Sequence, residues 1–411
     1  MFSSKQMPTE DKDVPPGLKF LKLCARYTQD LVRERTTQGG AMPRNRHIAI
    51  DIKVELETIV EVFLTAWKNP VVIEDSFEEL VEASKGKQGG KSRDEQLQDA
   101  WQPPFATQPD GSRILLSRPT MFMDNEGVVF AWYLPGIFTS RRSELVFEYV
   151  RRAGCETKSV LSITKPGNDN WRNGSEAFAN PTRCQIPPGQ ANFSACWYAQ
   201  GHGPPNHLPG PSSTLNPKAG HNGGPELLED LMDTNVIIGT LLSLVHPSLF
   251  DMQFKVLLEV YRKLHSQRCP VTNPELTQEV FKHWSTPFSG FAIIANRETP
   301  LHRDTQGGRT MLDILSVFGD HSGGRLEIPL LNARFVYNPK TAFVLPGYLM
   351  QHGASRTEGE RVCIASYMRP TVGEGILKGG YEAFGPPTAD DLMESFGLML
   401  AEEPSVDIWA K

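Results

Sequence analysis

Between Phe291 and Arg369 the chain reads FAIIANRETPLHRDTQGGRTMLDILSVFGDHSGGRLEIPLLNARFVYNPKTAFVLPGYLMQHGASRTEGERVCIASYMR. Short apolar or β-branched runs alternate with turn residues such as Gly323-Gly324 and Asn338-Pro339, a pattern typical of several short strands. This rhythm predicts a double-stranded β-helix, that is, a jelly-roll barrel. The expected strands cover residues 291–295, 311–318, 325–330, 334–337, 341–345 and 362–368, and the strand-like run that begins at Thr341 continues to Met350.

Three potential metal ligands lie within this stretch. His302 and Asp304 form an H-x-D pair, and His352 follows the strand-like run that ends at Met350. In an extended segment residues i and i+2 point the same way, so both side chains of the pair can face inward. Two imidazoles and a carboxylate on one face of a metal suit non-haem Fe(II), because they leave positions open for a co-substrate and dioxygen. An H-x-D pair alone is more often structural, so the prediction rests on the three residues together.

Arg361 opens the last strand-like run. A dicarboxylate that chelates iron through a 2-oxo acid end needs a cation for its far carboxylate. A guanidinium offers a bidentate fork for that purpose. We therefore predict that Arg361 binds such a co-substrate. The alternative is a surface arginine between Glu360 and Val362.

These residues resemble those of the 2-oxoglutarate and Fe(II)-dependent dioxygenases, and within them the TET/JBP branch, particularly its fungal members. The enzymes of that branch oxidise methyl groups on DNA bases. The resemblance covers roughly residues 290–369 and, more loosely, residues 113–139. It implies an α+β protein with a jelly-roll dioxygenase core and flanking helices. It also implies Fe(II) and 2-oxoglutarate as cofactors, and a base that flips out of double-stranded DNA to reach the pocket.

The resemblance further assigns roles to single residues. Arg297 would contact the keto-acid end of 2-oxoglutarate, Arg361 its distal carboxylate, and Cys363 stands where a serine is frequent. Tyr367 would stack on the flipped base. The implied catalytic and iron-binding set is His302, Asp304 and His352; the cofactor-binding set is Arg361, Arg297 and Cys363; the substrate-binding set is Tyr367, Arg369 and Asn296.

Two positions on the substrate side depart from the family pattern. Arg369 stands where relatives often have a histidine that hydrogen-bonds the target base, and Gly307 where they carry an Asn or Asp that reads it. Two substrates therefore stay open. One is 5-methylcytosine, oxidised to hydroxymethyl, formyl and carboxyl forms; the other is N6-methyladenine, which would be demethylated.

The net charge of the chain limits the kinds of partner that it is expected to bind. The 411 residues carry a net charge of −6, whereas proteins that wrap nucleic acid are usually basic. An enzyme that flips one base needs only a local basic rim, for which the arginines of a predicted helix at 140–152 are candidates. Two alternatives remain: a dioxygenase that acts on a protein side chain or a small molecule, and a non-catalytic barrel that binds modified DNA.

The sequence also bears on location and on a second metal. No apolar run approaches the roughly 20 residues that cross a bilayer, and the polar N-terminus lacks a signal-peptide core. We expect an intracellular, nuclear protein without a membrane partner, and a monomer. Zinc could be imagined at Cys184, Cys196, His202 and His207, but the spacing contains no C-x-x-C pair and favours a loop with free cysteines.

The expected organisation has four parts. A disordered tail at 1–17 precedes a helical region at 18–100, and a dioxygenase domain at 101–370 precedes a helical extension at 371–411. The domain would contain a long loop at 168–224, because its Gly- and Pro-rich sequence lacks periodicity, and inserted helices at 226–285.

Overall fold

The computed structural model describes residues 14–36, 47–85, 92–155, 161, 172, 174–199, 201–217, 223–381 and 384–399. Most of the expected tail at 1–17 and the end of the extension at 371–411 lie outside these residues. The domain boundaries stay a prediction.

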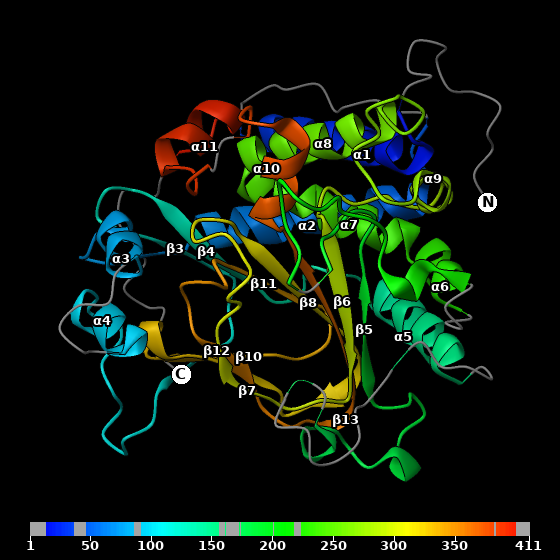
Figure 1. Ribbon diagram of the computed structural model, residues 1–411. Coiled ribbons are helices and arrows are strands. Elements are labelled where there is room, and N and C mark those ends of the chain that lie inside the picture. The colour runs from blue at the N-terminus through cyan, green and yellow to red at the C-terminus, as the bar shows by residue number, and fades with distance from the viewer. Residues whose placement is uncertain are drawn as a thin grey trace.

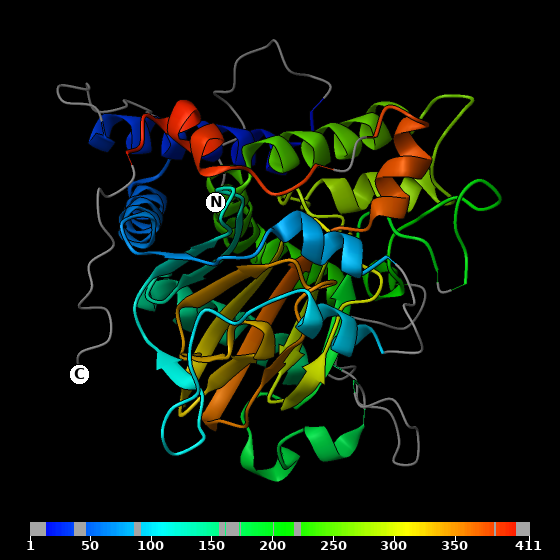
Figure 2. The same ribbon diagram turned by 90° about the vertical axis from the view of Figure 1, so that its left-hand side faces the viewer.

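Two β-sheets face each other and form the body of the molecule (Figures 1 and 2). The larger sheet has the strand order β1-β3-β4-β11-β8-β13-β6-β5, and the smaller β2-β10-β9-β12-β7. This is the predicted jelly-roll core in an α+β protein. The strands are β1 (Pro70–Val72), β2 (Ile114–Leu116), β3 (Thr120–Met123), β4 (Val129–Leu134), β5 (Gly189–Phe193), β6 (Gly290–Ala295), β7 (Thr299–His302), β8 (Asp313–Ser322), β9 (Arg325–Ile328), β10 (Ala333–Val336), β11 (Thr341–Leu345), β12 (His352–Ala354) and β13 (Glu358–Tyr367).

Central strands of the larger sheet are buried on both faces. In β11, Ala342 and Val344 pack into a core shared with helices, whereas Phe343 and Leu345 pack into the core between the sheets. The alternation follows from the period of two in a strand. A strand covered on both sides reads as a continuous apolar run, which is why its position could be predicted from the sequence.

Helices cover the outer face and one end of the larger sheet (Figure 1). Helices α1, α2 and α7 share a hydrophobic core with this sheet. The helices are α1 (Pro16–Thr36), α2 (Ile50–Trp67), α3 (Phe77–Ala83), α4 (Arg93–Asp99), α5 (Ser140–Cys155), α6 (Gly224–Asp230), α7 (Met232–Val245), α8 (Pro247–Arg262), α9 (Pro274–Phe281), α10 (Pro370–Leu377) and α11 (Ala389–Phe396). Among these helices, none is both long and apolar enough to span a membrane.

A buried ion pair ties the N-terminal helices to the barrel. Arg142 of α5 donates two hydrogen bonds to the carboxylate of Glu55 of α2, at 2.7 and 3.0 Å. Both side chains are less than a tenth exposed. Two charges buried in this way need each other, because either alone would lack compensation.

The expected strand at 341–345 is β11; a turn follows it, and His352 opens β12. One detail differs from the sequence-based expectations. Residues 189–193, inside the expected loop at 168–224, form β5 and pair with β6. Helix α4 lies inside the expected helical region at 18–100, and Ser92 and Glu95 make a capping box at its start.

Candidate active site

The two histidines lie side by side because their strands pair. In the antiparallel register of β7 and β12, His302 is directly opposite His352, and their ring centroids are 4.4 Å apart. Cross-strand neighbours on one face of a sheet are close enough to interact directly. The pairing therefore brings together two residues that are 50 positions apart in the sequence.

Both imidazoles have a fixed orientation. Nδ1 of His302 lies 3.0 Å from the carbonyl oxygen of Pro300, and Nδ1 of His352 lies 2.9 Å from that of Met350. A carbonyl only accepts, so each Nδ1 carries the hydrogen and each Nε2 keeps its lone pair. Burial, with the neighbouring His352, lowers the pKa of His302 to about 3, so this ring is neutral at physiological pH.

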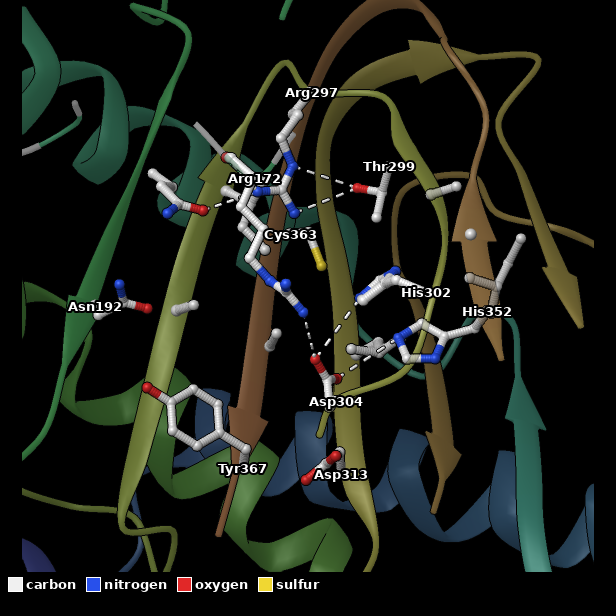
Figure 3. Close-up of a pocket in the computed structure, with 18 of the residues that line it drawn as sticks. Arg172, Asn192, Arg297, Thr299, His302, Asp304, Asp313, His352, Cys363 and Tyr367 are labelled. Carbon is white, nitrogen blue, oxygen red and sulfur yellow. Dashed lines mark hydrogen bonds and ion pairs between the residues drawn. The ribbon is translucent and has the colours of Figure 1, made fainter. Parts of the chain in front are cut away.

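Asp304 completes the group from the turn after β7. Its carboxylate oxygens lie 3.7 Å from Nε2 of His302 and 3.7 Å from Nε2 of His352 (Figure 3). The Asp304 amide donates to the carbonyl of Gly347 at 2.9 Å, which ties the carboxylate to the turn before β12. A Cβ at Gly347 would lie 3.2 Å from a carboxylate oxygen of Asp304, so a side chain there would crowd the group.

The donor set fits a metal ion. Within the described part of the chain, one set of three or more potential ligands is close enough to hold a metal, namely His302, Asp304 and His352, whose ligand atoms all lie within 4.8 Å of one another. Two lone-pair nitrogens and one carboxylate match the ligand set of non-haem iron. The carbonyls that fix each Nδ1 supply the usual outer-shell support of ligating histidines. The imagined zinc ligands Cys184, Cys196, His202 and His207 form no such set.

The group opens into a cavity of about 410 Å³ between the two sheets. Arg361, Arg297 and Cys363 also line this cavity, so the structure brings the expected cofactor-binding residues to the same place as the histidines. Arg361 is 3% exposed and donates to the backbone carbonyls of Ser355 and Arg297. Since a guanidinium has more donors than these, it keeps some for a ligand.

Arg297 and Cys363 are held by neighbours that the sequence did not indicate. The guanidinium of Arg297 donates to Gln190 Oε1 at 2.8 Å and to the carbonyl of Arg172 at 2.9 Å. Burial lowers the pKa of Arg297 to about 10, so the group stays charged at neutral pH. The Cys363 thiol lies 3.7 Å from the hydroxyl of Tyr337, a buried residue that also lines the cavity.

The expected base-binding residues divide into two kinds. Tyr367 and Arg369 line the cavity, and the Arg369 guanidinium lies 4.3 Å from the centroid of the Tyr367 ring. Asn296 does not line it: its positive φ of 53° turns the side chain toward β13. There Asn296 Oδ1 accepts from the Arg361 amide at 2.9 Å, and its Nδ2 donates to the carbonyl of Ile186 at 3.0 Å. The structure therefore gives Asn296 a place in the backbone frame beside the cavity instead of a place against the substrate.

Two further residues reach the centre without having been expected. Asp313 lies beside Asp304, is 4% exposed, and has a carboxylate oxygen without a hydrogen-bond partner among the described residues (Figure 3). Burial and the charge of Asp304 raise the pKa of Asp313 well above its usual value. Arg172 extends from the segment before β5 to within 3.5 Å of the Asp304 carboxylate. Asp313 reads as the start of an apolar strand and Arg172 lies in an aperiodic segment, so neither carried a signal.

The arginines of the basic helix expected at 140–152 form ion pairs with carboxylates of the protein. Arg141 pairs with Glu144, and Arg142 is buried against Glu55. Arg151 and Arg152 pair with Glu148 and Asp230. Helix α5 also packs on β8 and β13, on the side of the larger sheet away from the smaller one. Its arginines are therefore poor candidates for contact with a nucleic acid.

Residues 194–370 match the family model Tet_JBP, described as the oxygenase domain of the 2OGFeDO superfamily. This part of the chain is TET/JBP-like. The TET/JBP-like region contains β6 to β13 and all three potential iron ligands, and its superfamily uses Fe(II) and 2-oxoglutarate. Among solved structures, the chain is similar to NgTET1 in complex with 5mC DNA, with a TM-score of 0.44 and 12% identity over 84% of this chain and 98% of that one. No curated protein matches the chain.

Proposed function

We propose that the chain is a 2-oxoglutarate- and Fe(II)-dependent dioxygenase that oxidises methyl groups on bases of double-stranded DNA. The main support for this proposal is that His302, Asp304, His352 and the buried Arg361 all line one cavity of a TET/JBP-like barrel. The substrate would be 5-methylcytosine, taken to hydroxymethyl, formyl and carboxyl forms, or N6-methyladenine, or both. A nuclear location and a monomeric state stay predictions.

The residues around the cavity would have different binding roles. Nε2 of His302, Nε2 of His352 and the Asp304 carboxylate would hold Fe(II), and Arg361 the distal carboxylate of 2-oxoglutarate, with Arg297 at the other end. When bound, Fe(II) and 2-oxoglutarate would activate dioxygen, which is the oxidant that hydroxylates a C–H bond while 2-oxoglutarate is converted to succinate and CO2. The protein itself contributes position and exclusion of water.

Three side chains at the other end of the cavity suit a flipped base. The Tyr367 ring offers a stacking face and Arg369 offers donors. Asp313 also lines the cavity, and its Oδ2 lies 3.9 Å from the point where a Cβ at Gly307 would stand. These groups do not distinguish adenine from cytosine, because both bases present a ring nitrogen beside an amino group, and this supports keeping both bases.

The test is turnover on defined DNA. Purified protein is given Fe(II), ascorbate, 2-oxoglutarate and duplexes that carry either 5-methylcytosine or N6-methyladenine. Succinate is quantified and the bases are analysed by mass spectrometry. We expect succinate release that depends on one or both duplexes, together with oxidised bases.

Two controls decide between the alternatives. Asp304→Ala should abolish turnover and metal binding, whereas Asp320→Ala, which removes an exposed carboxylate on β8, should leave both unchanged. Succinate release without any DNA would favour a protein or small-molecule substrate. DNA binding without succinate release would favour a non-catalytic reader of modified DNA.

A further inference from the structure

A pair of exposed arginines shares one aromatic ring beside the cavity. The guanidinium carbon of Arg93, the first residue of α4, lies 5.0 Å from the centroid of the Tyr348 ring, and that of Arg309 lies 5.2 Å from it. Both arginines are exposed, whereas Tyr348 is 9% exposed and therefore held in place. We call Arg93, Tyr348 and Arg309 the arginine–tyrosine cluster.

The cluster is fixed at the edge of the candidate metal group. Tyr348 follows Gly347, whose carbonyl accepts from the Asp304 amide at 2.9 Å. The Cβ atom of Tyr348 lies 3.8 Å from the point where a Cβ on Gly307 would stand. Gln306, next to Gly307 in the sequence, lines the cavity. Helix α4 lies beside the barrel edge formed by β12 and β7 (Figure 1), and Arg303 of the turn after β7 pairs with Asp94 of α4 at 2.7 Å.

The charges of the cluster are not compensated within the part of the chain that the structure describes. Neither Arg93 nor Arg309 has an ion pair there, and the nearby Asp94 is taken by Arg303. The carboxylates of Glu78, Glu79, Glu82 and Asp99 line a separate cavity between α3 and α4. Two like charges on one ring repel each other, which the ring face offsets only in part. An anion between or beside them would remove that repulsion.

We propose that the arginine–tyrosine cluster binds backbone phosphates of duplex DNA next to the flipped nucleotide. This inference rests on the proposed function, and it locates the basic rim that a chain with net charge −6 needs in order to hold DNA. Phosphate is favoured over a carboxylate-bearing peptide because the cluster lies beside the cavity into which a base must turn. The phosphates on either side of a nucleotide whose base enters this cavity would lie near the cluster. Tyr348 acts as a positioning residue, since its ring holds both guanidinium groups.

The binding test compares variants on one methylated duplex. Arg93→Gln with Arg309→Gln should raise the Kd about tenfold and should lower the slope of log K against log salt by roughly 2, one for each lost phosphate contact. Tyr348→Leu should raise Kd as well, whereas Tyr348→Phe, which keeps the ring, should bind like the wild type. Arg141→Gln is the matched control, because it removes an exposed arginine that pairs with Glu144 on α5; it should change neither quantity.

Succinate release without DNA, from the slow turnover of 2-oxoglutarate alone, should be equal in all these variants, because none touches the cavity. An unchanged Kd and an unchanged salt slope in the double arginine variant would overturn the cluster as a phosphate site, while the proposed function would stand. A wild-type protein that neither binds nor oxidises any methylated duplex would overturn the proposed function and the cluster with it.

Discussion

Arg361 combines deep burial with a charge that has no carboxylate partner among the described residues. Its pKa is lowered by burial from that of a free guanidinium, and its donors go to backbone carbonyls. A buried cation held only by dipoles is costly in the absence of an anion. That cost is the physical reason to expect an anionic ligand in this cavity.

Arg361→Lys should raise the KM for 2-oxoglutarate by roughly ten- to a hundredfold, with a smaller effect on kcat. A lysine keeps the charge but loses the planar fork, and a hydrogen bond to a charged group contributes about 1.5–3 kcal/mol. Steady-state succinate kinetics measure this. Arg356→Lys is the control, because Arg356 is mostly exposed and pairs with Glu298. An unchanged KM in a folded Arg361→Lys protein would argue against the assignment.

The group of three potential metal ligands could be found in the sequence because H-x-D spacing and a later histidine are local patterns. Asp313 and Arg172 could not, since their roles depend on which strands face each other. Asn296 shows the opposite case: the resemblance placed it with the substrate-binding residues, but a left-handed backbone directs its amide to β13. Side-chain direction at a strand end is set by φ and ψ, which composition does not reveal.

At the scale of elements, the turn between β11 and β12 determines the space around the candidate metal group. A Cβ at Gly347 would lie 2.6 Å from Asp313 Oδ2 and 3.2 Å from Asp304 Oδ2. Gly347→Ala should therefore displace Asp304 and weaken metal binding by about tenfold or more, with little change in thermal stability. Titration with Mn(II) or Fe(II) measures the affinity. Gly203→Ala, where a Cβ would meet nothing within 4 Å, is the control and should bind metal normally.

A second element-scale prediction concerns the start of α8. His246 Nδ1 accepts from the Leu249 amide, and burial lowers the pKa of His246 to about 4. In the unfolded chain the pKa of His246 is near 6.5. Between pH 6.5 and 4, His246 is therefore protonated in the unfolded chain and neutral in the folded one. Stability from this residue is present above pH 6.5 and is lost as the pH falls toward 4.

His246→Asn keeps a good N-cap but does not titrate. Relative to the wild type, it should gain roughly 2–3 kcal/mol of unfolding free energy as the pH falls from 6.5 to 4.5. Urea unfolding at both pH values measures the difference. The exposed His265 serves as the control, and His265→Asn should track the wild type throughout. A parallel response of His246→Asn and wild type would contradict the prediction.

At the scale of the whole molecule, the N-terminal helices belong to the same folded body as the barrel. Trp132 of β4 stacks on Phe63 of α2, and the buried Arg142–Glu55 pair joins α5 to α2. Glu55→Ala should destabilise the protein by about 3–5 kcal/mol, because it leaves Arg142 buried without a partner. Glu55→Leu with Arg142→Met should recover most of that loss. Glu144→Ala, at the exposed pair with Arg141, should change the unfolding free energy by less than about 0.5 kcal/mol.

Much of the barrel could be predicted from the sequence, because β11 and the buried parts of β8 and β13 are rich in apolar residues. Strand β5 could not, since its alternating pattern is short and lies among glycine and proline residues. The position of α4 depends on a capping box and on Arg303, which lies 209 residues from its partner Asp94. Elements that are short and held by distant partners leave little trace in local sequence.

The pairing of β7 with β12 has a consequence for evolution of the chain. Side chains of a strand alternate between faces, so an insertion or deletion of one residue in the turn at 346–351 would shift His352 away from His302 and turn it toward the opposite side of the sheet. Length changes elsewhere on the surface would leave the histidines aligned. This junction joins a strand of the larger sheet to a strand of the smaller one, and its length is therefore as constrained as the glycine at position 347.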